Sequence, residues 1–192
     1  MYSIEDHIGT FIVNLKKAGY KLFDYLPNQD WKPGDQILYA GPYWDDQEPT
    51  AAISSLLTGK WLPAGEKVNK FEKEFSKRFD FKHSVMVNSG SSANLVMIAA
   101  LKKYFGWADN DEIIVCACGF PTTINPIIQN GLKPVFVDID WNDLNWNLDE
   151  LENKITEKTV AVFSSPVLGN PYDCLLYTSD AADEGLGVDL GG

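Results

Sequence analysis

Apolar side chains in the N-terminal third of the chain recur at helical spacing. Residues 4–17 place them on one face of a polar helix, at Ile8, Phe11, Ile12 and Leu15. A turn-rich connector follows, and a second helix is predicted over residues 45–58, ending near Gly59. The segment 62–79 carries another apolar stripe, which predicts a surface helix packed on a core through Val68, Phe71, Phe75 and Phe79.

From residue 84 onward, short apolar runs alternate with helical stretches. Strands are predicted at 84–88, 112–116, 134–140 and 159–165, and helices at 91–105, 121–131 and 148–155. This alternation, with strands that are apolar throughout, predicts an α/β fold of three layers in which helices cover both faces of a mostly parallel sheet. Ligands of such sheets bind beyond the carboxyl ends of the strands. The residues after each strand are therefore the candidates for a site.

The charge balance narrows the classes of partner. The chain has 192 residues, with 27 acidic against 16 basic side chains and a formal net charge of -11. An acidic protein lacks the basic face that nucleic acid requires, so a nucleic-acid partner is excluded. A small anionic ligand remains allowed, because a few backbone N–H groups can bind one whatever the net charge.

The cysteines and the N-terminus indicate a cytoplasmic protein. Three unevenly placed cysteines form no disulfide framework, which favours a reducing compartment. Cys116 and Cys118 lack the spacing of a zinc site and are interpreted as buried apolar thiols. The first twenty residues contain acids and no unbroken apolar run, so we expect neither a signal peptide nor a membrane span.

The strongest candidate for a binding loop follows the strand predicted at 84–88. The sequence Asn-Ser-Gly-Ser-Ser-Ala-Asn at 88–94 begins a helix with small residues and hydroxyls. Such a loop leaves backbone N–H groups open at the positive end of the helix dipole, which suits a phosphate. A plain helix N-cap with a tight turn explains the same residues, so this loop alone leaves both interpretations open.

Three further positions follow the other predicted strands. Phe120, just before a helix, is either a core plug or a flat apolar face for a cofactor ring. Asp138 and Asp140 suit a metal or acid–base chemistry, although a solvated strand terminus explains them equally. Asn170, in the polar turn after the last strand, either donates to a ligand or holds its own loop.

Taken together, these motifs resemble a known family. From about Ile37 to Asp173 the chain is similar to the first half of the large domain of the DegT-type sugar aminotransferases, which are fold-type-I pyridoxal phosphate enzymes. The resemblance rests on G-K-W-L-P-A-G with F-E-K-E-F, on N-S-G-S-S-A-N, on G-F-P-T-T-I-N-P-I-I-Q-N-G-L-K-P-V-F-V-D-I-D and on L-G-N-P. G-F-P-T-T-I-N-P with L-G-N-P is more similar still to the CDP-4-keto-6-deoxyglucose 3-dehydratase branch.

The resemblance implies roles for individual residues. The family's phosphate cup falls on Gly90, Ser91 and Ser92, and its ring-stacking aromatic falls on Phe120. Asn170 matches a position that places a polar side chain near the cofactor's 3-hydroxyl. The loop that borders the nucleotide-sugar site in relatives falls on Lys60, Trp61 and Leu62.

The family's catalytic groups fall beyond the matched stretch. The carboxylate that pairs with the pyridine nitrogen and the Schiff-base lysine both lie past Asp173, and no lysine present here matches the catalytic motif. In the dehydratase branch a histidine replaces that lysine, and the cysteines of a [2Fe-2S] cluster follow. The chain as given is therefore expected to hold phosphate and ring at best, to be inactive, and to be marginally stable.

The resemblance also implies a division of the chain and a function. Residues 1–60 form an N-terminal helical segment with a substrate-side loop, 61–173 form the first half of the pyridoxal-phosphate-dependent domain, and 174–192 resemble a translated sequencing adapter and are expected to be non-native. The full-length protein is implied to be a homodimer that uses pyridoxal or pyridoxamine 5'-phosphate on a nucleotide-linked 4-keto-6-deoxyhexose, with 3-dehydration favoured and transamination as the alternative. A non-catalytic nucleotide-sugar or phosphate-binding module is the alternative from another class.

Overall fold

The computed structural model describes residues 2–20, 22, 32–35, 45–60, 65–142, 144–165 and 170. The chain divides into two compact units, Met1–Met86 and Val87–Gly192. The first unit contains the helices α1 (Ile4–Lys17), α2 (Gln47–Thr58) and α3 (Glu66–Arg78). The second contains α4 (Gly90–Phe105), β1 (Glu112–Cys116), α5 (Pro121–Gln129), β2 (Lys133–Val137), α6 (Leu148–Lys154) and β3 (Thr159–Phe163). The functional division that the sequence predicts at residues 60 and 61 stays a prediction.

The first helix forms where the sequence predicts it. Ser3 and Asp6 make a reciprocal capping box, in which Ser3 Oγ accepts from the Asp6 N–H at 3.1 Å and Asp6 Oδ2 accepts from the Ser3 N–H at 2.7 Å. Ile8 and Ile12 are buried on the apolar face. The predicted stripe therefore does cover a core, although Phe11 of the same stripe stays 59% exposed.

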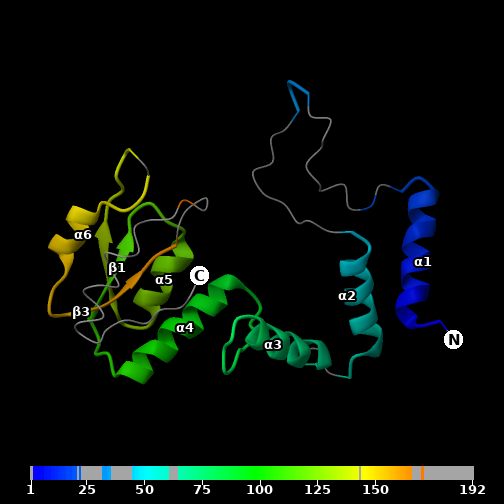
Figure 1. Ribbon diagram of the computed structural model, residues 1–192, viewed down its shortest axis with the longest axis horizontal. Helices are drawn as coiled ribbons and strands as arrows, with labels where there is room; N and C mark the ends of the chain where they lie inside the picture. The colour runs from blue at the N-terminus through cyan, green and yellow to red at the C-terminus, as the bar shows by residue number, and fades with distance from the viewer. Residues whose placement is uncertain are drawn as a thin grey trace. The chain divides into compact units, whose positions relative to one another are not determined.

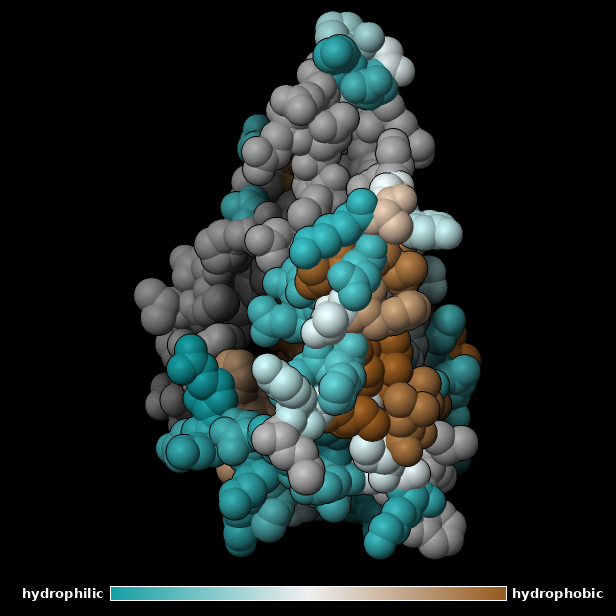
Figure 2. Space-filling model, turned by 90° about the vertical axis from the view of Figure 1, so that its right-hand side faces the viewer, coloured by the Kyte–Doolittle hydropathy of each residue, from teal (hydrophilic) through white to brown (hydrophobic). Residues whose placement is uncertain are grey.

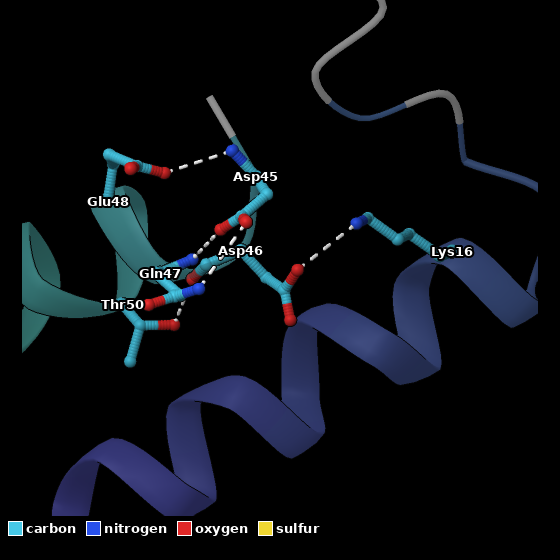
Figure 3. Close-up of polar contacts among 6 residues, drawn as sticks. All are labelled: Lys16, Asp45, Asp46, Gln47, Glu48 and Thr50. Carbon is cyan, nitrogen blue, oxygen red and sulfur yellow. Dashed lines mark hydrogen bonds and ion pairs between the residues drawn. The ribbon is translucent and has the colours of Figure 1, made fainter. Parts of the chain in front are cut away.

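Side chains at the start of α2 fix that helix and tie it to α1 (Figure 3). Asp45 Oδ1 accepts from the Gln47 N–H at 2.7 Å, and Glu48 Oε2 accepts from the Asp45 N–H at 2.9 Å. Asp46 lies 3.6 Å from the Lys16 ammonium in the last turn of α1. The predicted end at Gly59 is confirmed, because Gly59 is the C-cap of α2.

The apolar stripe of α3 forms, but the expected packing on a core is wrong for the described residues. No residue of α3 is buried, and Phe71, Phe75 and Phe79 are each at least 38% exposed. The rings contact one another instead, with centroids 5.5 Å apart for Phe71 and Phe75 and 4.6 Å apart for Phe75 and Phe79. Hydrophobic side chains also lie on the surface of the molecule on the side of α1, which faces the viewer in Figure 2.

The strand predicted at 84–88 is absent from the structure. This segment has no ladder with any described strand, and side chains of α3 bind it instead. Glu72 accepts from the Met86 N–H at 2.8 Å, and the hydroxyls of Ser76 and Ser84 lie 2.7 Å apart. An apolar run becomes a strand only where a neighbouring strand completes its backbone hydrogen bonds, and here none does.

The second unit has the predicted parallel sheet, with strand order β2-β1-β3. β1 lies in the middle and pairs in parallel with both neighbours, with Ile114 opposite Val135 on one side and Val162 on the other. The chain passes from β1 through α5 to β2, then back across β1 through α6 to β3 (Figure 1). All three strands therefore end at the same edge of the sheet.

Alternate side chains of β1 pack into two separate cores on opposite faces of the sheet. Helices therefore cover both faces, and the predicted three layers are present. Ile113 and Val115 pack with Ile98 of α4 and Ile127 of α5. Ile114 packs on the opposite face with Leu151 of α6. Figure 1 shows α6 on one side of the sheet and α4 with α5 on the other. Among the described residues, no helix has the length and apolar character needed to cross a bilayer.

A buried carboxylate joins the amino ends of the strands. Glu112, the first residue of β1, accepts from the Lys133 ammonium of β2 at 2.8 Å and from the Thr156 hydroxyl at 2.8 Å. Its own N–H donates to the Lys158 carbonyl at 2.8 Å. The hydrogen bonds from Lys133 and then Thr156 hold the pKa of Glu112 below its ordinary value.

The lowered pKa of Glu112 predicts a pH-dependent contribution to stability. Because the folded-state pKa is depressed, ionised Glu112 stabilises the fold above its unfolded-state pKa of about 4.3, and this stabilisation is lost as the pH falls through the folded value. Glu112→Gln should therefore lower the free energy of unfolding at neutral pH, and the difference from wild type should shrink below about pH 4. Urea denaturation over a pH series measures this difference, with the exposed Glu157→Gln as control. A difference that stays constant with pH would contradict the expectation.

Candidate functional site

The first turn of α4 presents open backbone N–H groups. Ser89 is the N-cap, and its Oγ accepts from the Ser92 N–H at 3.2 Å. Within the described part of the chain, the N–H groups of Gly90 and Ser91 have no hydrogen-bond partner. Apart from its chain neighbours and its own helix backbone, no described residue comes within 4 Å of where a Cβ on Gly90 would lie, so the described part of the chain leaves space beside this turn. The N-cap interpretation of the loop is correct, and it leaves two donors for an anion.

Phe120 lies at the N-cap of α5, directly before Pro121 at the first helical position. Its side chain is 70% exposed, so the core-plug interpretation is wrong. The exposed ring is available as a flat apolar face at the carboxyl end of β1.

Two hydrogen bonds show that α4 and α5 run side by side in the same direction. Asn94 Nδ2 donates to the Thr122 carbonyl at 3.1 Å, and Lys102 Nζ donates to the Asn130 carbonyl at 2.6 Å. Each bond joins residues 28 apart in the sequence, one near the beginning and one near the end of the helices. The N-termini of α4 and α5 therefore lie together, with their positive dipole ends at one place.

These two N-termini also differ in charge from those of the other helices. The first turns of α1, α2, α3 and α6 all contain Asp or Glu, whereas those of α4 and α5 contain none. An acidic side chain in a first turn neutralises the helix dipole and repels an anion. The paired N-termini of α4 and α5 thus keep a positive partial charge beside Gly90 and Ser91, because no acidic side chain in their first turns offsets it.

Sequence reasoning missed Asn94 as the residue that aligns these helices. Its amide joins the first turns of α4 and α5, and so sets the position of Phe120 relative to the loop at 89–92. The available signal was its placement inside a helix, because asparagine is a poor helix former and often bonds another backbone there. The absence of acids from two adjacent N-termini was a second signal in the printed sequence.

The two cysteines at the end of β1 have different environments. Cys116 is half-buried, whereas Cys118 is exposed, so the expectation of buried thiols is wrong for Cys118. Burial, with smaller contributions from Cys118 and Asp138, raises the pKa of the Cys116 thiol, although a backbone hydrogen bond from Cys118 opposes the shift. The Ala117 N–H donates to the Val137 carbonyl at 2.8 Å and keeps the ends of β1 and β2 together.

The carboxylates after β2 belong to a turn. Asp140 Oδ1 accepts from the backbone and side-chain amides of Asn142 at 2.8 and 2.7 Å. Asp138 is exposed, and its Oδ1 accepts from the Ile139 N–H at 2.8 Å. These contacts favour the solvated strand terminus over an acid–base pair. In the described ranges, no group of His, Cys, Asp and Glu is arranged to hold a metal ion.

The structure brings together some of the predicted site residues. Gly90, Ser91 and Ser92 lie with Phe120 at the adjoining N-termini of α4 and α5. Asn170 is exposed, and its flanking residues lie outside the described ranges, so its role stays a prediction. Lys60 is exposed in the first unit, directly after α2.

The rest of the predicted substrate loop, Trp61 and Leu62, lies outside the described residues. The assignment of Lys60, Trp61 and Leu62 to the substrate therefore stays a prediction.

Comparison with known proteins identifies the family. The profile of the DegT/DnrJ/EryC1/StrS aminotransferase family matches residues 44–188 of the chain. The chain belongs to this family. The resemblance stated from the sequence is thereby confirmed. The match extends past Asp173 into residues 174–192, so the non-native origin of that segment stays a prediction.

Members of the family with similar sequences and folds include dehydratases and aminotransferases. The GDP-4-keto-6-deoxy-D-mannose 3-dehydratase of Yersinia pseudotuberculosis is 46% identical over 136 residues, covering 70% of this chain and 34% of that protein. A structure of the E. coli GDP-4-keto-6-deoxy-D-mannose-3-dehydratase with bound hydrated PLP has a TM-score of 0.66 at 41% identity, covering 74% of this chain and 37% of the other. Helicobacter pylori PseC, an aminotransferase of pseudoaminic acid biosynthesis, has a TM-score of 0.68 at 28% identity, with 79% and 40% covered.

The chain contains one part of the fold that these family members have. The chain spans about a third of the length of the curated relatives that it matches. Its three-layer α/β unit has the fold of these pyridoxal-phosphate-dependent enzymes, as the sequence predicts, and it forms a part of their structure.

Proposed function

We propose that this chain is part of a pyridoxal- or pyridoxamine-5'-phosphate-dependent enzyme that acts on a nucleotide-linked 4-keto-6-deoxyhexose. The reaction favoured is 3-dehydration in the biosynthesis of deoxysugars or surface polysaccharides, because the similar proteins from Yersinia and E. coli are named as 3-dehydratases. The cytoplasm is the proposed location, and a homodimer is the proposed assembly of the full-length protein. These proposals extend beyond the chain itself, since it spans only a third of its relatives.

The adjoining N-termini of α4 and α5 carry the proposal. Two backbone N–H groups, at Gly90 and Ser91, are open beside a dipole that no first-turn acid offsets. Ser91 and Ser92 add hydroxyl groups at the same turn. A phosphate group fits these donors. The exposed Phe120 ring, aligned with this turn through Asn94, fits a planar ring attached to that phosphate.

The described residues account for binding and orientation rather than bond breaking. When bound, the cofactor supplies an electron sink for carbanion chemistry. The α4 turn would hold its phosphate, Phe120 would support one face of its ring, and the Lys102–Asn130 contact would keep the two helices in register. Asn170 is proposed to lie near the cofactor's 3-hydroxyl, and Lys60, Trp61 and Leu62 to border the nucleotide sugar. The proton-transfer residues are proposed to follow Asp173.

Transamination is the alternative reaction, supported by the family's description and by the likeness to PseC. The two reactions are separated by product analysis on the protein with the coding sequence after Asp173 restored. Mass spectrometry of the nucleotide sugar should show loss of the 3-hydroxyl group if the protein is a dehydratase. Gain of an amino group at the ketone carbon would show transamination, and a lysine in the Schiff-base position would agree with it.

Two further expectations concern an iron–sulfur cluster and a non-catalytic binding module. The iron–sulfur cluster that the dehydratase branch implies stays a prediction, because the E. coli structure is described with bound PLP alone and the name of the Yersinia protein mentions no cluster. A non-catalytic phosphate- or nucleotide-sugar-binding module predicts no absorbance change when pyridoxamine phosphate is added to the full-length protein. The exposed ring beside the phosphate turn favours the enzyme over this module.

Phe120→Ala should weaken cofactor binding without unfolding the chain. Loss of an aromatic contact costs about 0.5–1.5 kcal/mol, or roughly two- to tenfold in dissociation constant. Because Phe120 is 70% exposed, the stability of the fold should barely change. Calorimetric titration with pyridoxamine 5'-phosphate measures the effect, and this probe cannot form a Schiff base with surface lysines. Phe120→Tyr keeps the ring and serves as the matched control, so an equal loss in both variants would contradict stacking.

A further inference from the structure

Helix α1 lies outside the part of the chain that the family profile matches. The profile begins at residue 44, whereas α1 ends at Lys17. Nevertheless, α1 packs against α2, which lies inside the matched part, and both helices belong to the first compact unit. The contacts between the two helices therefore decide what α1 can contribute to the family's domain.

Polar contacts near both ends hold α1 antiparallel to α2. In the first turn of α1, Glu5 Oε1 accepts from the Ser54 hydroxyl in the second half of α2 at 2.5 Å. In the last turn of α1, the Lys16 ammonium lies 3.6 Å from Asp46, the N-cap of α2. Ser54 is only 1% exposed, so water competes little for its bond to Glu5.

Glu5 also interacts with the start of α3. The hydrogen bond from Ser54, then that from its own backbone N–H, and further the positive charge of Lys67 hold the pKa of Glu5 below its ordinary value. Lys67 is in the first turn of α3, and Ser54 is in the last turns of α2. Glu5 thus interacts with residues on both sides of the segment that joins α2 to α3.

Lys60, at the beginning of this joining segment, is the described residue of the predicted substrate loop. It is exposed and directly follows Gly59, the C-cap of α2. A lysine ammonium suits the diphosphate of a nucleotide sugar. Ser54 precedes Lys60 by less than about two helical turns. Because a helix end frays less when a side-chain contact holds it, the bond from Ser54 to Glu5 restrains the position of Lys60.

We propose that Glu5 is a positioning residue for the nucleotide sugar, which holds the end of α2 through Ser54 and the start of α3 through Lys67, and so keeps Lys60 in place for the substrate. Helix α1 then acts on substrate affinity. The proposed cofactor turn at Gly90 belongs to the second compact unit, so cofactor affinity is not affected. This inference rests on the proposed function, which assigns Lys60 to the nucleotide sugar.

Ser54→Ala should raise the KM for the nucleotide sugar roughly three- to tenfold without changing kcat. Loss of the bond lowers the fraction of molecules with Lys60 in place, which weakens apparent affinity and leaves the bound complex unchanged. The fold should persist, because alanine is the better helix former and the exposed Glu5 carboxylate can bind water. The measurement uses the protein with the coding sequence after Asp173 restored, and GDP-4-keto-6-deoxy-D-mannose and CDP-4-keto-6-deoxyglucose as substrates.

Further variants separate this bond from general effects. Glu5→Ala should raise KM at least as much as Ser54→Ala, and the double variant should be no worse than Glu5→Ala, because both substitutions break one interaction. Glu66→Ala removes the same charge at the exposed start of α3 and should keep the wild-type KM. In the absence of substrate, trypsin should cut Ser54→Ala faster after Lys60, and at the wild-type rate after the exposed Lys103 of α4.

Each outcome of this experiment decides one statement. An unchanged KM in Ser54→Ala, with wild type active, overturns the role of Glu5 and leaves the proposed function intact. An equal rise of KM in Glu66→Ala shows a general effect of charge and also overturns that role. A lower midpoint of urea denaturation together with weaker binding of pyridoxamine 5'-phosphate shows a purely structural bond, with the same consequence. Failure of the wild-type protein to convert either sugar overturns the proposed function itself.

Discussion

Ser91→Glu should abolish most cofactor binding while preserving the fold. The new carboxylate would stand at the first turn of α4, where the phosphate is proposed to bind. Negative groups about 5 Å apart at an exposed helix end repel by about 2–3 kcal/mol, which is on the order of 100-fold in affinity. The same carboxylate is favourable toward the helix dipole by about 0.3–1 kcal/mol, so the variant should unfold no more readily than wild type.

A matched variant isolates the position from the charge. Ala100 is exposed on the same helix, more than two turns further along, and Ala100→Glu adds the same single charge. Titration calorimetry with pyridoxamine 5'-phosphate should give near wild-type affinity for this control. Equal weakening by both substitutions would show a general effect of net charge and would contradict the phosphate site at α4.

Ile113→Ala should cause the largest loss of stability in the second unit. Ile113 is fully buried in the middle strand and packs in the core that joins α4, α5 and the sheet. Truncating a buried isoleucine to alanine costs about 2–5 kcal/mol through lost burial and the cavity left behind. Since whole domains are stable by only about 5–15 kcal/mol, this variant should be largely unfolded in mild denaturant.

The edge strand supplies the control for this prediction. Val162 lies on β3 and is 39% exposed, so Val162→Ala should cost less than about 1 kcal/mol. Urea denaturation followed by circular dichroism compares the two variants. Equal midpoints for Ile113→Ala and wild type would show that this core does not hold the unit together.

The alternating half of the fold could be predicted because its signals are local. Continuous apolar runs identified β1, β2 and β3, and Ser89 and Gly106 mark both ends of α4. The segment 84–88 shows the limit of such signals. Its composition suits a strand, yet its neighbours in space are the side chains of Glu72 and Ser76, and pairing depends on neighbours rather than on composition.

The candidate site was predictable in its parts and not in its arrangement. The small residues at 90–92 indicated an anion, and family resemblance pointed to Phe120. Their alignment depends on Asn94 and Lys102, whose contacts join residues 28 positions apart and leave no periodic pattern.

The claim that the paired helix N-termini hold a phosphate-bearing ring is tested most directly by removing the phosphate from the ligand. Pyridoxamine 5'-phosphate and pyridoxamine should be titrated in parallel into the wild-type chain by calorimetry. We expect the phosphorylated form to bind at least about 100-fold more tightly, and inorganic phosphate to compete with it. Equal affinity for the two forms, or no binding of either, would contradict the account.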